Sequence, residues 1–255
     1  MALAKADGVS IYYERHGSGP AVLLVHGSGG HHAAWWQQVA ALRGRFTVVT
    51  VDLRGFGNSD SSMPAFDGQD FPGDITAVLD QEDLRDVLLV GQSIGAVAAL
   101  RAGLSRPDRV RGVVLAHSLG GIADPELSEL VARDRAEAVQ LPVLDRLLSK
   151  RFQQEEPAKT FLFQQMGTFN VAKMADLRNL GADGPSIAEV VSSGLAVCFL
   201  AGENDAVLSA ATVRRAHDLV EGSRLELIPG GPHSMYWEAP ELFNAAVARV
   251  REALS

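Results

Sequence analysis

The feature that most constrains this chain is the pentapeptide at residues 91–95, Gly-Gln-Ser-Ile-Gly, which follows an apolar run at residues 87–90 and precedes an alanine-rich stretch. We expect a strand, a sharp turn and a helix here, with Ser93 at the tip of the turn. In a G-x-S-x-G turn the backbone at the serine is strained, and its hydroxyl projects above the end of the sheet. Glycine suits both flanks, because a side chain at Gly91 or Gly95 would collide where the strand and the helix nearly touch. The free N–H groups at the start of the helix would then face negative charge on a carbonyl attacked by Ser93.

Length and composition are typical of a soluble globular protein. The chain has 255 residues, of which 47% are hydrophobic and 21% are charged, enough for one large domain. Its net charge of −8 argues against nucleic acid or an anionic membrane surface as a partner. We expect no secretory signal in residues 1–13 and no membrane helix, because no window approaches the roughly 20 apolar residues that such a helix needs. The single cysteine, Cys198, lies in an apolar run and fits a buried position in a cytoplasmic protein.

Apolar strands alternate with helices over most of the chain, which is typical of an α/β fold with a parallel sheet. The stretch at residues 8–14 alternates in polarity and suits an edge strand. The runs predicted as further strands are residues 21–25, 46–51, 87–90, 110–116, 195–201 and 224–228. The segments predicted as helices between or after them are residues 33–42, 74–84, 210–220 and 240–254.

This alternation stops between residues 120 and 189. Helix-like stretches at residues 125–138, 143–152, 157–166 and 171–180 follow one another without a convincing β-branched strand. A helical insertion after a central strand is best explained as a lid over the strand ends, where ligands bind in open α/β sheets. We therefore predict a core domain formed by residues 1–119 and 190–255 and a helical cap formed by residues 120–189.

Ser93 needs partners, because a serine hydroxyl is a weak nucleophile near neutral pH. A base must take its proton, and a third group must hold that base in the right tautomer. Among the seven histidines His233 is the candidate base, since it follows the last strand at the same edge of the sheet as Ser93. Asp205 is the candidate acid and Glu203 the fallback, because both closely follow a buried strand at that edge. The order Ser, Asp, His along the chain is the one expected of this architecture.

The oxyanion formed by attack of Ser93 needs two fixed donors. The Ile94 N–H is one candidate, and the glycine-rich loop at residues 26–30 supplies the other, the Ser28 N–H or alternatively that of Gly29. We expect a substrate pocket lined by residues near these loops, in the cap and after the last strand: Gly27, Gly29, His31, Gln92, His117, Phe163 and Trp237.

Other polar clusters have simpler explanations. Asp52 also ends a strand, but the turn residues that follow it indicate that it holds its own loop together. His31, His32 and His117 share no ligand-like spacing with a carboxylate or cysteine, so we expect them to line the pocket rather than bind a metal. The glycine-rich loop lacks the G-x-x-x-x-G-K-[ST] pattern of a phosphate loop. We expect no metal and no organic cofactor.

Taken together, five motifs resemble those of the α/β-hydrolase superfamily, in its order and spacing: residues 26–30, 52–59, 91–95, 202–205 and 231–233. The resemblance spans nearly the whole chain. It implies an eight-stranded, mostly parallel sheet, a helical cap and a triad of Ser93, Asp205 and His233. Families with this appearance include carboxylesterases, lactonases, hydrolases of carbon–carbon bonds and haloperoxidase-like perhydrolases. Serine at the turn argues against epoxide hydrolases and haloalkane dehalogenases, which have aspartate there.

The leading hypothesis is a cytoplasmic serine hydrolase of small carboxylic esters or lactones that forms an acyl-enzyme on Ser93. The cap residues Phe161, Phe163, Met166, Phe169 and Met174 could line an apolar pocket or form a helix core. One alternative is a carbon–carbon bond hydrolase of a diketone, whose second carboxylate would need a cap cation such as Lys173 or Arg178. Another is a ligand-binding receptor on the same fold. The sequence leaves the oligomeric state open, with a homodimer as one option.

Overall fold

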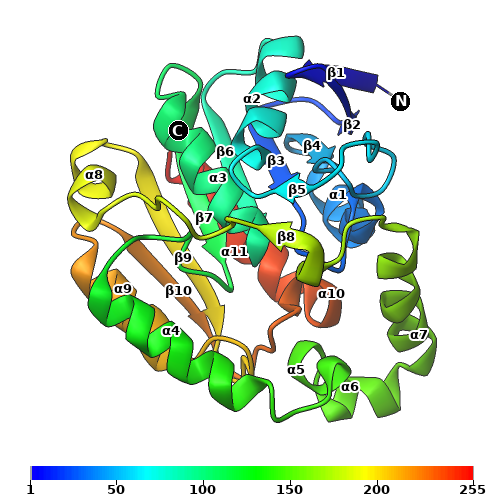
Figure 1. The fold of residues 1–255 in the computed structure, drawn as a ribbon, viewed down its shortest axis with the longest axis vertical. Helices are drawn as coiled ribbons and strands as arrows, with labels where there is room; N and C mark the ends of the chain where they lie inside the picture. The colour runs from blue at the N-terminus through cyan, green and yellow to red at the C-terminus, as the bar shows by residue number, and fades with distance from the viewer. Residues whose placement is uncertain (1, 255) are drawn as a thin grey trace.

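The computed structural model describes residues 2–254 and contains an eight-stranded sheet in the order β1-β2-β4-β3-β6-β7-β9-β10 (Figure 1). β1 and β2 are antiparallel to each other, as are β2 and β4, and every other neighbouring pair is parallel. The predicted eight-stranded, mostly parallel sheet is confirmed. The strands are β1 (Ala2–Ala6), β2 (Val9–His16), β3 (Ala21–Val25), β4 (Thr47–Val51), β6 (Val87–Gln92), β7 (Val110–Ala116), β9 (Ala196–Gly202) and β10 (Arg224–Ile228).

Helices cover both faces of this sheet because the central strands are apolar on both sides. One apolar cluster joins the sheet to α2 (Phe71–Gln81), α3 (Ile94–Ser105) and α9 (Ala210–Leu219). A second cluster on the opposite face joins it to α1 (Trp36–Leu42) and α11 (Pro240–Glu252). All residues of β3 and β4 are buried, as continuous apolar runs predict.

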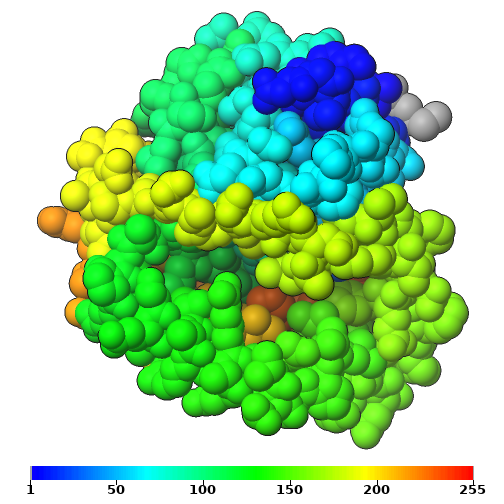
Figure 2. Space-filling view, viewed as in Figure 1, coloured from blue at the N-terminus to red at the C-terminus, as the bar shows by residue number. Residues whose placement is uncertain are grey.

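Residues 120–189 form the helical arc that borders one side of the molecule in Figure 1. It contains α4 (Pro125–Ala138), α5 (Val143–Leu147), α6 (Lys150–Glu155) and α7 (Pro157–Met166), followed by α8 (Ile187–Ser192). Figure 2 shows a hollow between the green residues of α4 and α5 and the yellow-green residues near position 180. This segment therefore borders an opening above the sheet.

Several predicted elements differ from the observed ones. The stretch at residues 8–14 is not an edge strand, because β1, which the sequence analysis missed, pairs with its outer side. The helix expected at residues 74–84 is α2 at Phe71–Gln81, and the one expected at 143–152 is divided into α5 and α6. The segment at 171–180 is not an α-helix: it holds a short 3-10 turn, Met174–Asp176, and a two-residue strand β8 (Leu177–Arg178) that pairs with β5 (Phe66–Asp67).

The short helix α10 (Met235–Glu238) was also not predicted. The predicted boundary of the cap at residue 189 lies inside α8, whose Val190 is buried in the main core. Residues 1 and 255, the outer limits of the predicted core domain, lie outside the described residues. Among the helices of residues 2–254, none is both long enough and apolar enough to cross a membrane.

Candidate active site

Ser93 lies between the end of β6 and the start of α3, where a strand turns sharply into a helix. Its φ of 54° and ψ of −116° are strained for a non-glycine residue, as expected of a nucleophile turn. Its N–H donates to Ala116 O of the neighbouring strand at 2.9 Å, which fixes the turn to the sheet. The glycine on each side is required by close backbone contact: a Cβ at Gly91 would lie 2.4 Å from Ala96 Cα, and one at Gly95 would lie 2.4 Å from Val25 O.

Asp205 and His233 lie side by side after β9 and β10. His233 Nδ1 is 3.0 Å from Asp205 Oδ1 and 2.9 Å from Oδ2, and both side chains are buried. The two loops meet at Gly202 and Gly231, where a Cβ on Gly202 would lie 2.0 Å from Gly231 O. Since a carboxylate can only accept, Nδ1 must carry the proton, and Nε2 keeps a lone pair. The alternative acid, Glu203, is exposed.

Asp205 also binds a second imidazole that sequence reasoning did not place there. His117 Nδ1 lies 3.0 Å from Asp205 Oδ2, and the rings of His117 and His233 meet edge-on with centroids 5.5 Å apart. His117 ends β7 with a φ of 56°, a strained value that directs it toward the neighbouring strand end. Its position directly after a buried strand was a usable signal, but the sequence does not show which carboxylate it meets.

The electrostatics of this cluster favour the charged form of the Asp205 carboxylate. Burial opposes the charged form of Asp205, but the two imidazoles and the N–H groups of Val207 and Leu208, at 2.7 and 3.0 Å, hold its pKa well below the ordinary value. Burial lowers the pKa of His117. With Nδ1–H donated to Asp205, His117 Nε2 is a buried acceptor that has no hydrogen-bond partner among residues 2–254.

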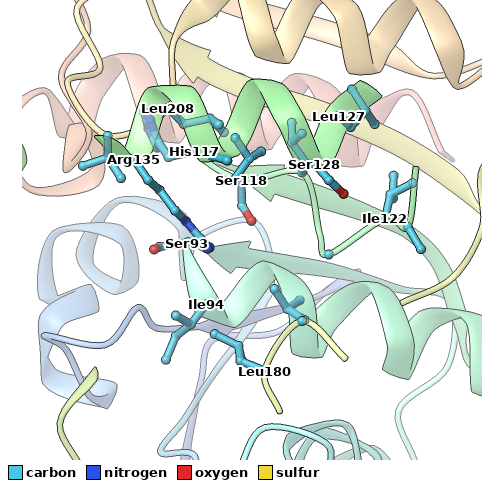
Figure 3. Close-up of a pocket in the computed structure, with 18 of the residues that line it drawn as sticks. Ser93, Ile94, His117, Ser118, Ile122, Leu127, Ser128, Arg135, Leu180 and Leu208 are labelled. Carbon is cyan, nitrogen blue, oxygen red and sulfur yellow. The ribbon is translucent and has the colours of Figure 1, made fainter. Parts of the chain in front are cut away.

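Ser93, His117 and His233 line one cavity of about 470 Å³ (Figure 3). This size is typical of a small-molecule site. The cavity is walled by the start of α3, the loop after β7, and α4 of the arc. Side chains on these walls are mainly apolar, with the serines Ser118 and Ser128 and one arginine, Arg135, among them. In residues 2–254 no hydrogen bond joins Ser93 Oγ to His233, but both face the same space.

Of the seven residues predicted to line the substrate pocket, only His117 lies on the wall of this cavity. Gly27 and Gln92 instead pack against each other beneath the turn, where a Cβ on Gly27 would lie 2.1 Å from Gln92 Oε1. Phe163 and Trp237 stack edge-to-face at 5.4 Å. Gly29 is exposed and His31 is buried, and neither borders the cavity.

The cap side chains divide between surface and core. Phe161 and Phe169 are exposed, and Phe163 and Met166 pack against the second apolar cluster. Met174 alone among the five borders the cavity. Two of these five residues, Phe163 and Met166, therefore pack against the core. The helix of the arc that lines the cavity is α4.

The candidate oxyanion donors lie on two different segments of the chain. Ile94 lines the cavity beside Ser93, and its N–H is the first of α3, where no helical carbonyl can accept it. Ser28 is half-buried in the loop after β3 and does not border the cavity. Neither N–H has a partner among the turn and loop backbone hydrogen bonds of residues 2–254.

Carboxylates lie close to two of the three histidines that the sequence analysis grouped, His32 and His117, although the sequence spacing shows none. His32 Nδ1 lies 2.8 Å from Asp52 Oδ2, which also accepts from Asn58 N at 2.8 Å. The bond to Asn58 holds the loop of Asp52 together, as expected, but Asp52 was expected to do this rather than to hold a histidine, and the bond to His32 corrects that expectation. His31, His32 and Asp52, like His117, Asp205 and His233, have potential ligand atoms within 4.8 Å of one another. In both groups the carboxylate is already hydrogen-bonded within the protein, which favours a structural or catalytic role over metal binding.

Comparison with known proteins identifies the family of this chain. Residues 22–246 match the sequence model of the alpha/beta hydrolase family. The chain belongs to the alpha/beta hydrolase family. A 2-(acetamidomethylene)succinate hydrolase of Mesorhizobium japonicum is 25% identical over 96% of this chain and 92% of its own length. The resemblance drawn from the five motifs is thereby confirmed.

Solved structures agree on the fold. A thermophilic esterase from Thermogutta terrifontis superposes with a TM-score of 0.83 at 22% identity, covering 99% of this chain and 98% of that chain. The enol-lactonase from Burkholderia xenovorans gives a TM-score of 0.78 at 21% identity, covering 97% and 98%. Other similar structures are a meta-cleavage product hydrolase and a bromoperoxidase. The family and its members support a hydrolase, and they differ in the reaction they catalyse.

Proposed function

We propose that this chain is a serine hydrolase of small carboxylic esters or lactones that works through an acyl-enzyme on Ser93. The observation that carries the proposal is that Ser93 lines the same cavity as His233, whose Nδ1 is bonded to the buried Asp205. Among similar proteins, one solved structure is described as an esterase and another as an enol-lactonase. We further propose that residues 120–189 act as the cap of this site, because α4 supplies one wall of the cavity.

In the proposed reaction, His233 Nε2 takes the proton of Ser93 Oγ as Oγ bonds to the substrate carbonyl carbon. The carbonyl electron pair moves to oxygen, where the Ile94 and Ser28 N–H groups are the proposed donors. The tetrahedral intermediate expels the alcohol, which takes the proton from His233. Water then loses a proton to Nε2 as its oxygen bonds to the acyl carbon. The second tetrahedral intermediate expels Ser93 Oγ, which takes that proton back from Nε2, and the acid leaves. Asp205 keeps the imidazole in the Nδ1–H tautomer throughout.

The carbon–carbon bond hydrolase was expected to use Lys173 or Arg178 as a carboxylate anchor. Lys173 Nζ donates to Gly167 O at 2.7 Å and to Asn170 O at 2.6 Å, so it serves the fold of its own loop. Arg178 is exposed on β8, and neither side chain borders the cavity. The two residues that motivated this alternative therefore do not support it.

The test is turnover of p-nitrophenyl acetate and butyrate by the wild type and by Ser93→Ala, with intact mass after exposure to a fluorophosphonate. We expect steady turnover beyond one equivalent per chain in the wild type and a loss of at least about a thousandfold in Ser93→Ala. The reagent should add one group as Ser93 Oγ bonds to phosphorus and fluoride leaves.

Ser118→Ala is the matched control for labelling, because its hydroxyl lines the same cavity. It should still take up one adduct, whereas Ser93→Ala should take up none. If the wild type stays unlabelled and Ser93→Ala hydrolyses the esters equally well, the proposal is wrong and a ligand-binding protein is the better reading.

A further inference from the structure

One face of α4 forms a wall of the cavity, and its composition changes along its length. The residues that line the cavity are spaced one helical turn apart: Leu127, Ser128, Val131, Ala132 and Arg135. Leu127 and Val131 are apolar and lie one turn apart on this face. Arg135 lies one turn further along, where the same spacing would place another apolar residue. Figure 3 shows Arg135 extending from α4 into the cavity toward Ser93.

The Arg135 guanidinium has no ion-pair partner among residues 2–254. It makes no hydrogen bond or ion pair with another residue of 2–254, and no aspartate or glutamate borders the cavity. The other arginine of α4 and a nearby arginine of α9 do form ion pairs. Arg133, two positions away on the same helix, lies 3.1 Å from Asp134 Oδ1, and Arg215 of α9 binds Glu126 at 2.7 Å.

Arg135 is exposed to solvent, and it borders a cavity that no aspartate or glutamate lines, in a protein with net charge −8. An anion that arrives with the substrate is the partner that such a guanidinium fits best. Arginine presents a planar fork of donors that matches a carboxylate in two parallel hydrogen bonds. The cavity wall also carries Ser118 and Ser128 hydroxyl groups, and no carboxylate borders it that would repel such an anion.

We propose that Arg135 anchors a carboxylate on the substrate, so that the preferred substrates are esters or lactones carrying a second, free carboxylate group. This inference rests on the proposed function, since it names the substrate class of the Ser93 site. The free carboxylate would be recognised by α4, whereas the ester group would be held at the turn between β6 and α3. The distance between the anchor and the reactive carbonyl thereby selects the length of the substrate.

The experiment compares esters of equal length with and without the charge: the p-nitrophenyl monoesters of glutaric and adipic acid against p-nitrophenyl pentanoate and hexanoate, with uncatalysed hydrolysis subtracted. The variants are Arg135→Gln and Arg135→Lys, with Arg133→Gln as the control that removes the same charge from the same helix outside the cavity. For Arg135→Gln, the ratio of kcat/KM between anionic and neutral esters should fall about tenfold or more, through KM. Arg135→Lys should keep part of the preference, because it retains charge without the fork.

Arg133→Gln should leave the ratio at its wild-type value. A fall of equal size in both Gln variants would instead indicate a general effect of net charge and would overturn the proposal. A wild type that does not distinguish the two ester classes would overturn it as well. Added salt should reduce the preference, because the anchor is partly exposed to solvent.

A binding measurement separates this inference from the proposed function. Calorimetry of monomethyl adipate and methyl hexanoate with Ser93→Ala, and with Ser93→Ala carrying Arg135→Gln, requires no turnover. If no ester is hydrolysed but monomethyl adipate binds only when Arg135 is present, the hydrolase proposal fails and the carboxylate anchor stands. If the esters are hydrolysed but affinity for monomethyl adipate is the same without Arg135, the anchor fails and the hydrolase proposal stands.

Discussion

The site residues of this protein are held in place by contacts with residues that lie far away in the sequence. Asp205 accepts from His117 and His233, which lie on either side of it in the sheet order. Each bond fixes the same tautomer, with Nδ1 protonated and a lone pair on Nε2. His233 is the proposed base, and His117 keeps Asp205 charged and in place.

His26 is a further buried imidazole, and its protonation should limit stability in acid. Its Nδ1–H donates to Gly27 O at 2.8 Å and its Nε2 accepts from Leu53 N at 3.1 Å, so protonation would remove the acceptor of Leu53. Burial lowers the pKa of His26 from 6.5 to about 4. Because the unfolded chain takes up the proton first, this stability is present above pH 6.5 and is lost as the pH falls toward 4. The loss should be on the order of 3 kcal/mol.

The measurement is the free energy of urea unfolding between pH 7.5 and 4.5 for the wild type and His26→Gln. The variant should be less stable at pH 7.5 and show a shallower dependence on pH. An NMR titration of the wild type gives a direct answer without any variant, and a His26 midpoint near 6.5 would contradict the prediction.

At the level of elements, the site depends on how closely α3 approaches β3. A Cβ at Gly95 would meet two backbone oxygens, Val25 O at 2.4 Å and His26 O at 2.5 Å, and backbone cannot move aside as a side chain can. We predict that Gly95→Ala destabilises the fold by about 2 kcal/mol or more and moves Ser93 out of line, with a large loss of esterase activity. Thermal unfolding and kcat/KM measure the two effects.

Gly44→Ala is the matched control, because a Cβ there meets nothing within 4 Å and the residue has no positive φ. Its stability should lie within about 1 kcal/mol of the wild type, since alanine also restricts the unfolded chain. Equal stability of Gly95→Ala and Gly44→Ala would show that the close approach of α3 to β3 is not needed.

On the scale of the whole molecule, the sheet separates two apolar cores that share no helix. Ile75 of α2 is buried in one cluster and Phe243 of α11 in the other. We predict that Ile75→Val and Phe243→Leu each cost about 1 kcal/mol and that their effects add to within about 0.5 kcal/mol. Chemical unfolding of the wild type, both variants and the double variant provides the comparison.

A coupling energy well above about 0.5 kcal/mol would mean that the sheet transmits strain between its faces. The second pair, Leu79→Ile and Val247→Ala, repeats the test with residues from the same two helices. Additivity in one pair and not in the other would place the coupling at particular contacts instead of across the sheet.

The sequence by itself determined the fold and the strand ends that carry the chemistry. Continuous apolar runs such as residues 21–25 can only be buried on both faces, and glycines at fixed positions permit only one kind of turn at Ser93. These are local signals, because burial periodicity and backbone sterics act over a few residues. The alternation of strands and helices then placed Ser93, Asp205 and His233 at one edge of the sheet.

Only the tertiary structure decided which residues surround that edge. The meeting of His117 with Asp205, the cavity face of α4 with Arg135, and the turn in place of a helix at residues 171–180 all depend on contacts across tens of residues. A short segment such as β8 has no strong periodicity, so its pairing with β5 sets its conformation. The wall of a cavity is likewise set by where helices pack, and a sequence shows the amphipathic face of a helix but not what that face meets.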